Sequence, residues 1–405
     1  MSLFGRRKKR IYLDYAAATP VRKEVALAMC PFERVEFGNA SAVHEEGRHA
    51  REAVETSRAR IAELLRIRKD EVFFVSGGTE ANNLAILGLC EALCSEGHLP
   101  QDCEIITTAL EHPSIARVLE QLKKRGVVVH TVPVDAEGLI DHVVFEQLLS
   151  SKTVLVTCAY ANSEIGVVQD VKRMTRAVRK CRKEHAHAFP FMHLDASQAP
   201  LYLSCAFDSL GVDLMTLDAG KCYGPKGVGV LAKKHAVPCH PLMQGGDQEG
   251  GIRPGTENTP LIVGCAEALY CAEKGRMVRA RNVEEIRDYA FTALETIPGI
   301  VCNGSRQARI ANNINISIPG IDGEYATVVL DAHGIAVSTK SACSGASGSG
   351  SSVVYALGGD DARALSTIRI TLGEETTKRN IDEMVRVLKG HVERTHTVFD
   401  QIQKK

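Results

Sequence analysis

The chain has 405 residues and lacks an excess of either charge, with 49 basic and 49 acidic residues. This balance gives no reason to expect a nucleic-acid or membrane-surface partner. No apolar run reaches about 18 residues, so the sequence predicts no transmembrane helix. The basic run RRKKR (6–10) is not followed by an apolar segment, which argues against a signal peptide and predicts a solvated tail.

Paired cysteine motifs are absent as well. The chain has 13 cysteines but no C-x-x-C pair, and Cys90 and Cys94 lie in a helical-looking segment. We therefore expect no zinc site and no other metal centre. Many thiols without a signal peptide indicate a reducing compartment, and we expect a cytoplasmic protein. A P-loop is also excluded, because nothing close to G-x-x-x-x-G-K-[ST] occurs.

Short β-rich runs alternate with helical patterns through the first two thirds of the chain. Such alternation predicts βαβ units around a mostly parallel sheet, in which ligands bind at the carboxyl ends of the strands. We therefore expect the functional residues just after these runs. The predicted strands are 71–76, 104–109, 127–134, 153–161, 191–197, 212–219 and 227–232.

The pattern changes in the last third. A long helical stretch (261–297) leads into what reads as a smaller α+β region. A chain of this length is too long for one small core, so two domains are expected. The segment SACSGASGSGSS (341–352) is rich in serine and glycine, which predicts a mobile loop. We assign 15–260 to a large domain, and 1–14 together with 261–405 to a small domain that carries this loop.

Several motifs place chemically capable residues at the predicted strand ends. The turn SGGTEANN (76–83) opens a helix and offers backbone amides to a phosphate, although Ser76 and Thr79 could equally be helix caps. His112, in LEHPSIARV, could likewise be no more than a helix cap. Asp195, in HLDASQAP, could cap the next helix or hold a positively charged ring nitrogen. Each residue alone leaves both readings open.

Lys221 and Cys343 are the two candidate nucleophiles. Lys221 follows a predicted strand in TLDAGKCYGPKGVGV, where burial in a cleft would favour the neutral amine that forms a Schiff base. Cys343 is flanked by small flexible residues and is either an idle exposed thiol or a nucleophile on a mobile loop; the other cysteines are expected to be inert. The order of phosphate-type turn, histidine, aspartate, lysine and loop cysteine is what a pyridoxal phosphate enzyme needs.

These motifs together resemble the cysteine desulfurases of the class V aminotransferase type, in the group with a long cysteine loop that serves iron–sulfur cluster assembly. The resemblance covers nearly the whole chain in family order. It implies the type I fold of pyridoxal-phosphate-dependent transferases: an α/β large domain with a mixed, mostly parallel seven-stranded sheet, and a smaller α+β domain. The motifs are YLDYAAATP (12–20), FGNASAVHEEGR (37–48), SGGTEANNLAI, EHPSI, SEIGVVQD (163–170), LDASQ, KCYGPKGVG, GGIRPGTENTP (250–260), SACSGAS and STIRITLG (366–373).

The resemblance implies a role for each matching residue. Lys221 matches the Schiff-base lysine, His112 the histidine that stacks on the ring and shuttles protons, and Cys343 the thiol that receives sulfur as a persulfide. Asn39 and Arg369 match residues on the substrate side, the arginine binding the substrate carboxylate. The implied cofactor-binding residues are Gly78 and Thr79 at the phosphate, Ser163 and Gln198 near the ring oxygen, Asp195 at the ring nitrogen, Lys221 itself, and Thr256, which would serve the partner subunit of a homodimer.

The implied activity is the conversion of L-cysteine to L-alanine, with sulfur passed from Cys343 to an acceptor or scaffold protein for iron–sulfur cluster or thio-cofactor assembly. Two alternatives stay open. One is a selenocysteine lyase or another class V β-lyase. The other is a scaffold of the same fold that has lost the cofactor.

Two residues near Lys221 depart from the family pattern at the phosphate. Asp218 stands where a serine or threonine is usual, and Gly220 stands where a histidine is usual. A carboxylate beside a phosphate dianion is repulsive unless it is protonated or turned away, and glycine removes a donor. Ser163, where an asparagine is usual, still has one hydrogen bond to donate. We therefore expect a desulfurase with a loosely held cofactor or a rearranged phosphate site.

Overall fold

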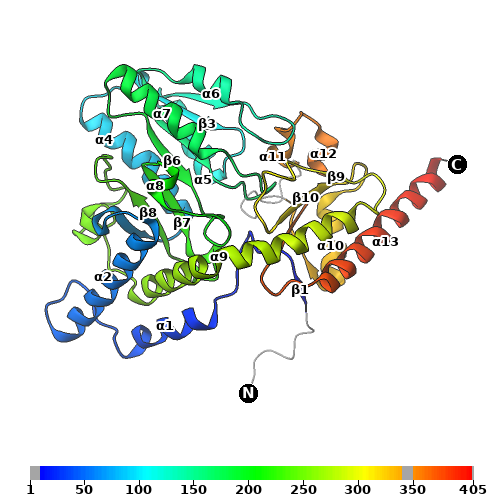
Figure 1. The fold of residues 1–405 in the computed structure, drawn as a ribbon, viewed down its shortest axis with the longest axis horizontal. Helices are drawn as coiled ribbons and strands as arrows, with labels where there is room; N and C mark the ends of the chain where they lie inside the picture. Colours follow the sequence, from blue (N-terminus) through cyan, green and yellow to red (C-terminus); the bar gives the residue numbers. More distant parts are fainter. Residues whose placement is uncertain (1–9, 340–349, 404–405) are drawn as a thin grey trace.

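The computed structural model describes residues 10–339 and 350–403, and its centre is a seven-stranded sheet (Figure 1). The strand order is β2-β8-β7-β6-β5-β3-β4. Strands β3 to β7 run parallel to one another, whereas β8 is antiparallel to both β7 and β2. The predicted mixed, mostly parallel sheet is therefore confirmed. Its strands are β2 Val72–Val75, β3 Glu104–Thr108, β4 Val128–Val132, β5 Thr153–Ala159, β6 Phe191–Asp195, β7 Leu214–Asp218 and β8 Gly229–Lys233.

The direction of β8 follows from its connection. Parallel neighbours need a crossover of a dozen or more residues, usually a helix. The chain passes from β7 to β8 through residues 219–228, which hold only one short 3-10 turn, η4 (Ala219–Lys221). This segment turns the chain back beside β7, and it is the segment that carries Lys221.

Both faces of the large sheet are covered by apolar contacts. Phe73 and Val75 pack in a cluster with residues of the helices on one face, while Val72 and Phe74 belong to the cluster on the other. Burial on both faces explains why the strands appear in the sequence as nearly continuous apolar runs. The covering helices are α2 Glu45–Leu65, α3 Gly78–Asn83, α4 Leu89–Ser95, α5 Pro113–Lys124, α6 His142–Leu148, α7 Val171–His185 and α8 Phe207–Leu210, with α1 Lys23–Arg34 beside α9.

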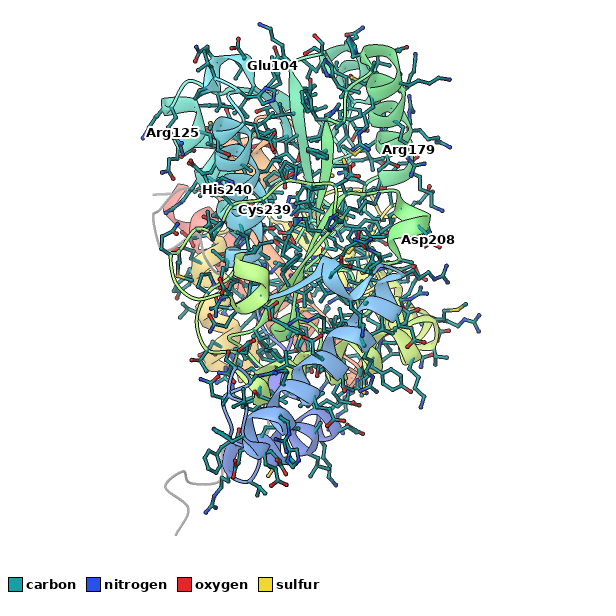
Figure 2. The ribbon with its side chains drawn as sticks, turned by 90° about the vertical axis from the view of Figure 1, so that its left-hand side faces the viewer. Glu104, Arg125, Arg179, Asp208, Cys239 and His240 are labelled. Carbon is teal, nitrogen blue, oxygen red and sulfur yellow. The ribbon has the colours of Figure 1, made fainter. Side chains whose placement is uncertain are left out.

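The amino ends and the carboxyl ends of the parallel strands lie at opposite ends of the sheet. Glu104, the first residue of β3, marks the amino ends at the top of Figure 2. Arg125, Arg179 and Asp208 are exposed around the periphery in the same view. The carboxyl ends lie at the other end of the sheet, where β6 and β7 finish at Asp195 and Asp218.

A second, smaller set of strands lies beside the large sheet. It comprises a three-stranded antiparallel sheet, β12-β10-β9, and the parallel pair β1-β11. Because β1 pairs with β11, the start of the described chain lies with its last third, which supports the predicted two-domain division; the division stays a prediction. The elements are β1 Ile11–Tyr12, β9 Val301–Cys302, β10 Asn313–Ser317, α10 Gly323–Ala332, β11 Ile335–Ala336, α11 Ser352–Tyr355, α12 Asp361–Leu365, β12 Thr367–Thr371 and α13 Lys378–Gln403.

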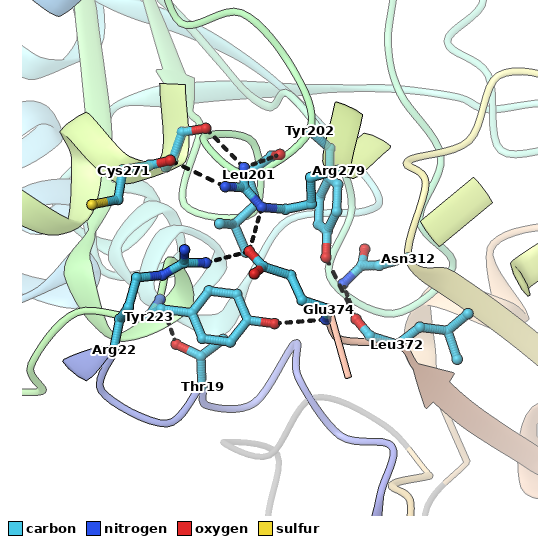
Figure 3. A network of polar contacts seen from close by, with 11 residues as sticks. Thr19, Arg22, Leu201, Tyr202, Tyr223, Cys271, Arg279, Asn312, Leu372 and Glu374 are labelled. Atoms are coloured by element: carbon cyan, nitrogen blue, oxygen red, sulfur yellow. Dashed lines mark hydrogen bonds and ion pairs between the residues drawn. The ribbon is translucent and has the colours of Figure 1, made fainter. Parts of the chain in front are cut away.

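The helix α9 (Thr259–Leu294) runs from one part to the other and carries a buried polar network (Figures 1 and 3). Arg279 of this helix donates to the carbonyl of Leu201 at 3.0 Å and pairs with Glu374, which follows β12. The amide of Glu374 donates to the Tyr223 hydroxyl at 3.0 Å. The network therefore ties the end of β12 to the segment just after Lys221.

Across residues 10–339 and 350–403, no helix is both long enough and apolar enough to cross a membrane. The same residues contain no group of three or more histidine, cysteine, aspartate or glutamate side chains arranged to hold a metal ion.

Candidate functional site

A pocket opens at the carboxyl ends of β5, β6 and β7. It combines residues that lie far apart in the sequence, from the segment after β1 to β12. The lining includes the sequence candidates Gly78, Thr79, His112, Ser163, Asp195, Gln198, Lys221 and Arg369, together with Asp218. The structure thus brings most of the proposed site residues into one cavity.

Lys221 reaches this pocket from the turn η4, directly after β7. Its side chain is only half-buried, and its Nζ donates to the backbone carbonyl of Ala17. Asp218 caps the turn, because its Oδ1 accepts from the amide of Gly220 at 2.8 Å. The amine of Lys221 therefore lies on the pocket wall, at a position set by the strand end and by this cap.

Asp195 is held at the end of β6 by hydrogen-bond donors on both oxygens. Its Oδ1 accepts from the amide and hydroxyl of Ser197 at 3.0 and 2.6 Å. Its Oδ2 accepts from Asn82 Nδ2 at 2.9 Å. Charge-assisted bonds of this kind fix the carboxylate in one orientation facing the pocket.

His112 both caps a helix and lines the pocket, so the two sequence readings are compatible. It is the N-cap of α5, and its Nδ1 accepts from the amide of Ser114 at 3.1 Å. Because an amide only donates, Nδ1 is unprotonated and the proton of the neutral ring is on Nε2. Burial lowers the pKa of His112, which favours this neutral form. Asn82 contacts the Ser114 hydroxyl at 2.9 Å and so links His112 to Asp195.

Arg369 lies on β12 and is almost completely buried, with 1% of its surface exposed. Its Nη2 pairs with Asp14 at 2.8 Å and its Nη1 donates to the carbonyl of Ser163 at 3.1 Å. Its Nε is buried without a hydrogen-bond partner among the described residues. Gln198 donates to the carbonyl of Ala16 at 3.0 Å. The segment after β1 thus supports both side chains.

Two further candidates, Asn39 and Thr256, lie outside the pocket. Asn39 is exposed and caps its own loop, its Oδ1 accepting from the amide of Ser41 at 2.9 Å. Thr256 is exposed in the loop before α9. Neither lines the pocket within this chain. Cys343 lies outside the described residues.

The described cysteines are all free thiols. Burial raises the pKa of Cys158 and Cys222 well above the usual value, and that of Cys239, beside His240 in Figure 2, to about 11. Thiols held in the protonated form are poor nucleophiles.

Four residues that the sequence did not single out hold the site together. Asn82, Ser114, Ser197 and Asp14 each bond directly to a candidate side chain. All four lie within motifs quoted above for their neighbours. Asn82 follows Thr79 by three residues on one helix, a spacing that places both on the same face. That spacing was a signal that Asn82 faces the pocket. Its bond to Asp195 and the pair of Asp14 with Arg369 depend on tertiary structure, whereas Ser114 and Ser197 each lie two residues after the side chain that they contact.

Glu111 is a further acid beside the pocket, half-buried as a residue. Its Oε1 accepts from the Thr108 hydroxyl at 2.6 Å and from the Ala159 amide at 3.3 Å, while its Oε2 is buried without a partner among the described residues. Burial and the nearby Asp195 carboxylate raise the pKa of Glu111 from the usual 4.5 to about 8. The folded protein therefore keeps this proton at neutral pH.

This proton makes stability depend on pH. Between about pH 4.5 and 8 the unfolded chain releases the Glu111 proton and the folded chain retains it, so stability falls as pH rises. Glu111→Gln should remove a slope of up to about 1.4 kcal/mol per pH unit in the free energy of unfolding. Urea unfolding at several pH values measures this slope. Glu120→Gln, at an exposed position of α5, is the matched control; an unchanged slope in Glu111→Gln would contradict the assignment.

Comparison with known proteins shows the family of this chain. The chain matches the family model for aminotransferase class-V over residues 11–384. It is 39% identical over 392 residues to the cysteine desulfurase IscS of Dictyoglomus turgidum, with 96% of each chain covered. A solved NifS-like protein has a TM-score of 0.87 at 31% identity, covering 95% of this chain and 100% of that chain. The structure of SspA in complex with cysteine has a TM-score of 0.76 at 30% identity, covering 90% and 99% of the two chains. The chain belongs to the cysteine desulfurases of the class V aminotransferase family.

Proposed function

We propose that this protein takes sulfur from L-cysteine, releases L-alanine and transfers the sulfur through Cys343 to an acceptor. One observation carries the proposal: the Lys221 amine, the Asp195 carboxylate and the His112 imidazole line a single pocket in a chain of this family. A structural relative solved in complex with cysteine supports the choice of substrate.

Cysteine desulfurases and other class V aminotransferases use pyridoxal phosphate. The residues at the ring end of the pocket fit that cofactor. Lys221 supplies an amine for the aldehyde, Asp195 a fixed carboxylate for the ring nitrogen, and His112 a flat neutral ring. At the phosphate end, the Gly78 amide is already bound by Asp218. When bound, the cofactor supplies an electron sink for the α-carbon of the substrate.

The chain's own residues supply binding and proton transfer. Arg369 is positioned to bind the substrate carboxylate, with Asp14 holding the guanidinium in place. Lys221 exchanges protons at its Nζ, and His112 carries a proton on Nε2 that it can donate. General acid–base steps of this kind contribute about 10²–10⁴-fold in rate.

The transfer of sulfur from cysteine to Cys343 needs no external oxidant. The Cys343 thiolate attacks the substrate sulfur and forms the S–S bond. The C–S bond breaks, its electron pair passes to the substrate carbon, and that carbon is protonated to give the methyl group of alanine. L-Cysteine and the Cys343 thiol thus become L-alanine and the Cys343 persulfide.

The proposal includes a homodimer in the cytoplasm. The exposed position of Thr256 is compatible with a contact to a partner subunit, which the family resemblance implies for this residue. The free thiols of the described residues suit a reducing compartment. The sulfur acceptor, or a scaffold protein that receives the persulfide, would bind near Cys343.

The test is an absorption spectrum of the purified protein combined with a product assay. We expect a coloured protein whose near-visible band disappears on borohydride treatment, and alanine release from cysteine. A protein that stays colourless with added cofactor would overturn the proposal in favour of a non-catalytic scaffold. Faster alanine release from selenocysteine than from cysteine would favour the lyase.

A further inference from the structure

The Asp218 carboxylate accepts hydrogen bonds from backbone amides at the end of the pocket where the phosphate is expected. Its Oδ2 accepts from the amide of Gly78 at 3.1 Å, and its Oδ1 accepts from the amide of Gly220 at 2.8 Å. The same Oδ2 lies 3.6 Å from the position that a Cβ at Gly77 would take. A carboxylate of the chain itself therefore fills the glycine turn before α3.

The amide of Gly78 has the properties of an anion site. It opens α3, which continues without a break through the π-helical turn η2 (Leu84–Gly88) into α4, so helical backbone extends to Ser95. The unpaired amides and the dipole of such a segment favour a negative group. Here the negative group is a side chain that is always present.

A second hydrogen bond also holds the Asp218 carboxylate in this position. Asp218 caps the turn η4 that carries Lys221, so rotating the carboxylate away from the pocket would give up the Gly220 amide as well as the Gly78 amide. Among the described residues that line the pocket, the cations are Lys221 and Arg369, and Arg369 is already paired with Asp14. A phosphate dianion entering here would meet a fixed negative charge.

We propose that Asp218 is a specificity-determining residue that removes most of the preference for pyridoxal phosphate over unphosphorylated pyridoxal. A carboxylate held close to a phosphate group repels it. This repulsion weakens the binding of pyridoxal phosphate but not that of pyridoxal, which carries no phosphate. Both forms carry the same ring, so both would meet the same residues, Asp195, His112 and Lys221, at the ring end of the pocket. The inference rests on the proposed function, since it assumes that a pyridoxal cofactor binds at Lys221.

The experiment measures dissociation constants for pyridoxal phosphate and pyridoxal by absorption and fluorescence titration. Free pyridoxal forms an internal hemiacetal that pyridoxal phosphate cannot form. This difference and the bond to Lys221 are the same for every variant, so the change in the ratio of the two constants between wild type and variant cancels both. Asp218→Asn should tighten pyridoxal phosphate by about 10- to 100-fold and leave pyridoxal within about twofold.

The variants are chosen so that the turn stays folded. Asparagine and serine cap helical turns about as well as aspartate, so Asp218→Asn and Asp218→Ser keep the support for Lys221. Asp218→Ser combined with Gly220→His adds a donor; a Cβ at Gly220 would lie 3.2 Å from Asp218 Oδ1, an atom that the serine removes. This double variant should bind pyridoxal phosphate most tightly.

Asp141→Asn is the matched control. Asp141 caps α6 by accepting from the amides of Val143 and Val144 at 2.9 and 3.1 Å, and it does not line the pocket. The same chemical change at this position should leave both dissociation constants unchanged.

The outcomes separate the inference from the proposed function. An unchanged ratio in Asp218→Asn would overturn the inference while leaving the desulfurase proposal intact. If neither cofactor form binds to any variant, the inference and the proposed function fail together.

Discussion

Lys221→Ala is expected to yield a colourless protein and to lower desulfurase activity by at least about 10²–10⁴-fold. The turn η4 places the Lys221 amine on the wall of the pocket, beside the carbonyl of Ala17. In the proposed function, alanine removes both the amine that attacks an aldehyde and the base that moves the substrate proton. Absorption spectroscopy and an alanine-release assay measure the two losses separately.

Lys226→Ala is the control for this change. Lys226 lies on the same segment between β7 and β8, but its Nζ donates to the carbonyl of Thr19 and it does not line the pocket. It should keep both the colour and the activity. Loss of the band in Lys226→Ala and its retention in Lys221→Ala would reassign the reactive amine.

Glu249→Ala is expected to lower the free energy of unfolding by about 3–5 kcal/mol. Glu249 follows β8 in the turn η5 (Gln248–Gly251), and its side chain is 2% exposed. Both of its oxygens accept from Arg58 of α2 at 2.8 Å, and Oε2 also accepts from the amide of Phe74 at 2.8 Å. Alanine would leave a buried guanidinium and a buried strand amide without this partner.

Glu55→Ala separates the buried partner from the exposed one. Glu55 bonds to Nε of the same Arg58 at 2.9 Å, but its side chain is 51% exposed. Exposed pairs contribute about 0–1 kcal/mol, so this variant should unfold close to the wild type in urea. Equal losses for Glu55→Ala and Glu249→Ala would show that the burial of the pair is not what matters.

The loop that Glu249 anchors continues to Thr256, the residue expected to serve a partner subunit. The backbone of Glu249 is in the left-handed region, with φ of 51°, which is uncommon for a residue with a side chain. The buried pair with Arg58 holds this conformation in place. We therefore expect Glu249→Ala to weaken any dimer contact made by the loop as well as the fold.

Secondary structure was largely predictable because its signals are local. Each apolar run predicted as a strand overlaps a strand of the large sheet, and the predicted helix 261–297 corresponds to α9 at Thr259–Leu294. The order of the strands was not predictable, nor was the antiparallel direction of β8. Order and direction depend on which runs pair across the fold, and nothing in the apolar pattern of a single run specifies its partner.

For Asp218, too, the sequence specified the residue type, whereas the tertiary structure specified its contacts. The sequence placed a carboxylate near the expected phosphate, which it would repel unless it were protonated or turned away. In the structure the carboxylate accepts from the amides of Gly78 and Gly220. Only the packing of α3 against the end of β7 brings the Gly78 amide within reach, since the two residues are far apart in the chain.

The sequence by itself determined which chemistry is available, because residue type sets what an amine, an imidazole, a carboxylate or a thiol can do. It also determined the order of these groups along the chain, and this order carried the family resemblance. The tertiary structure alone decided what holds each group: Asn82 at Asp195, Asp14 at Arg369 and Asp218 at Gly78. These contacts join residues more than 100 positions apart, and such distances are closed by packing of the whole core rather than by any local preference.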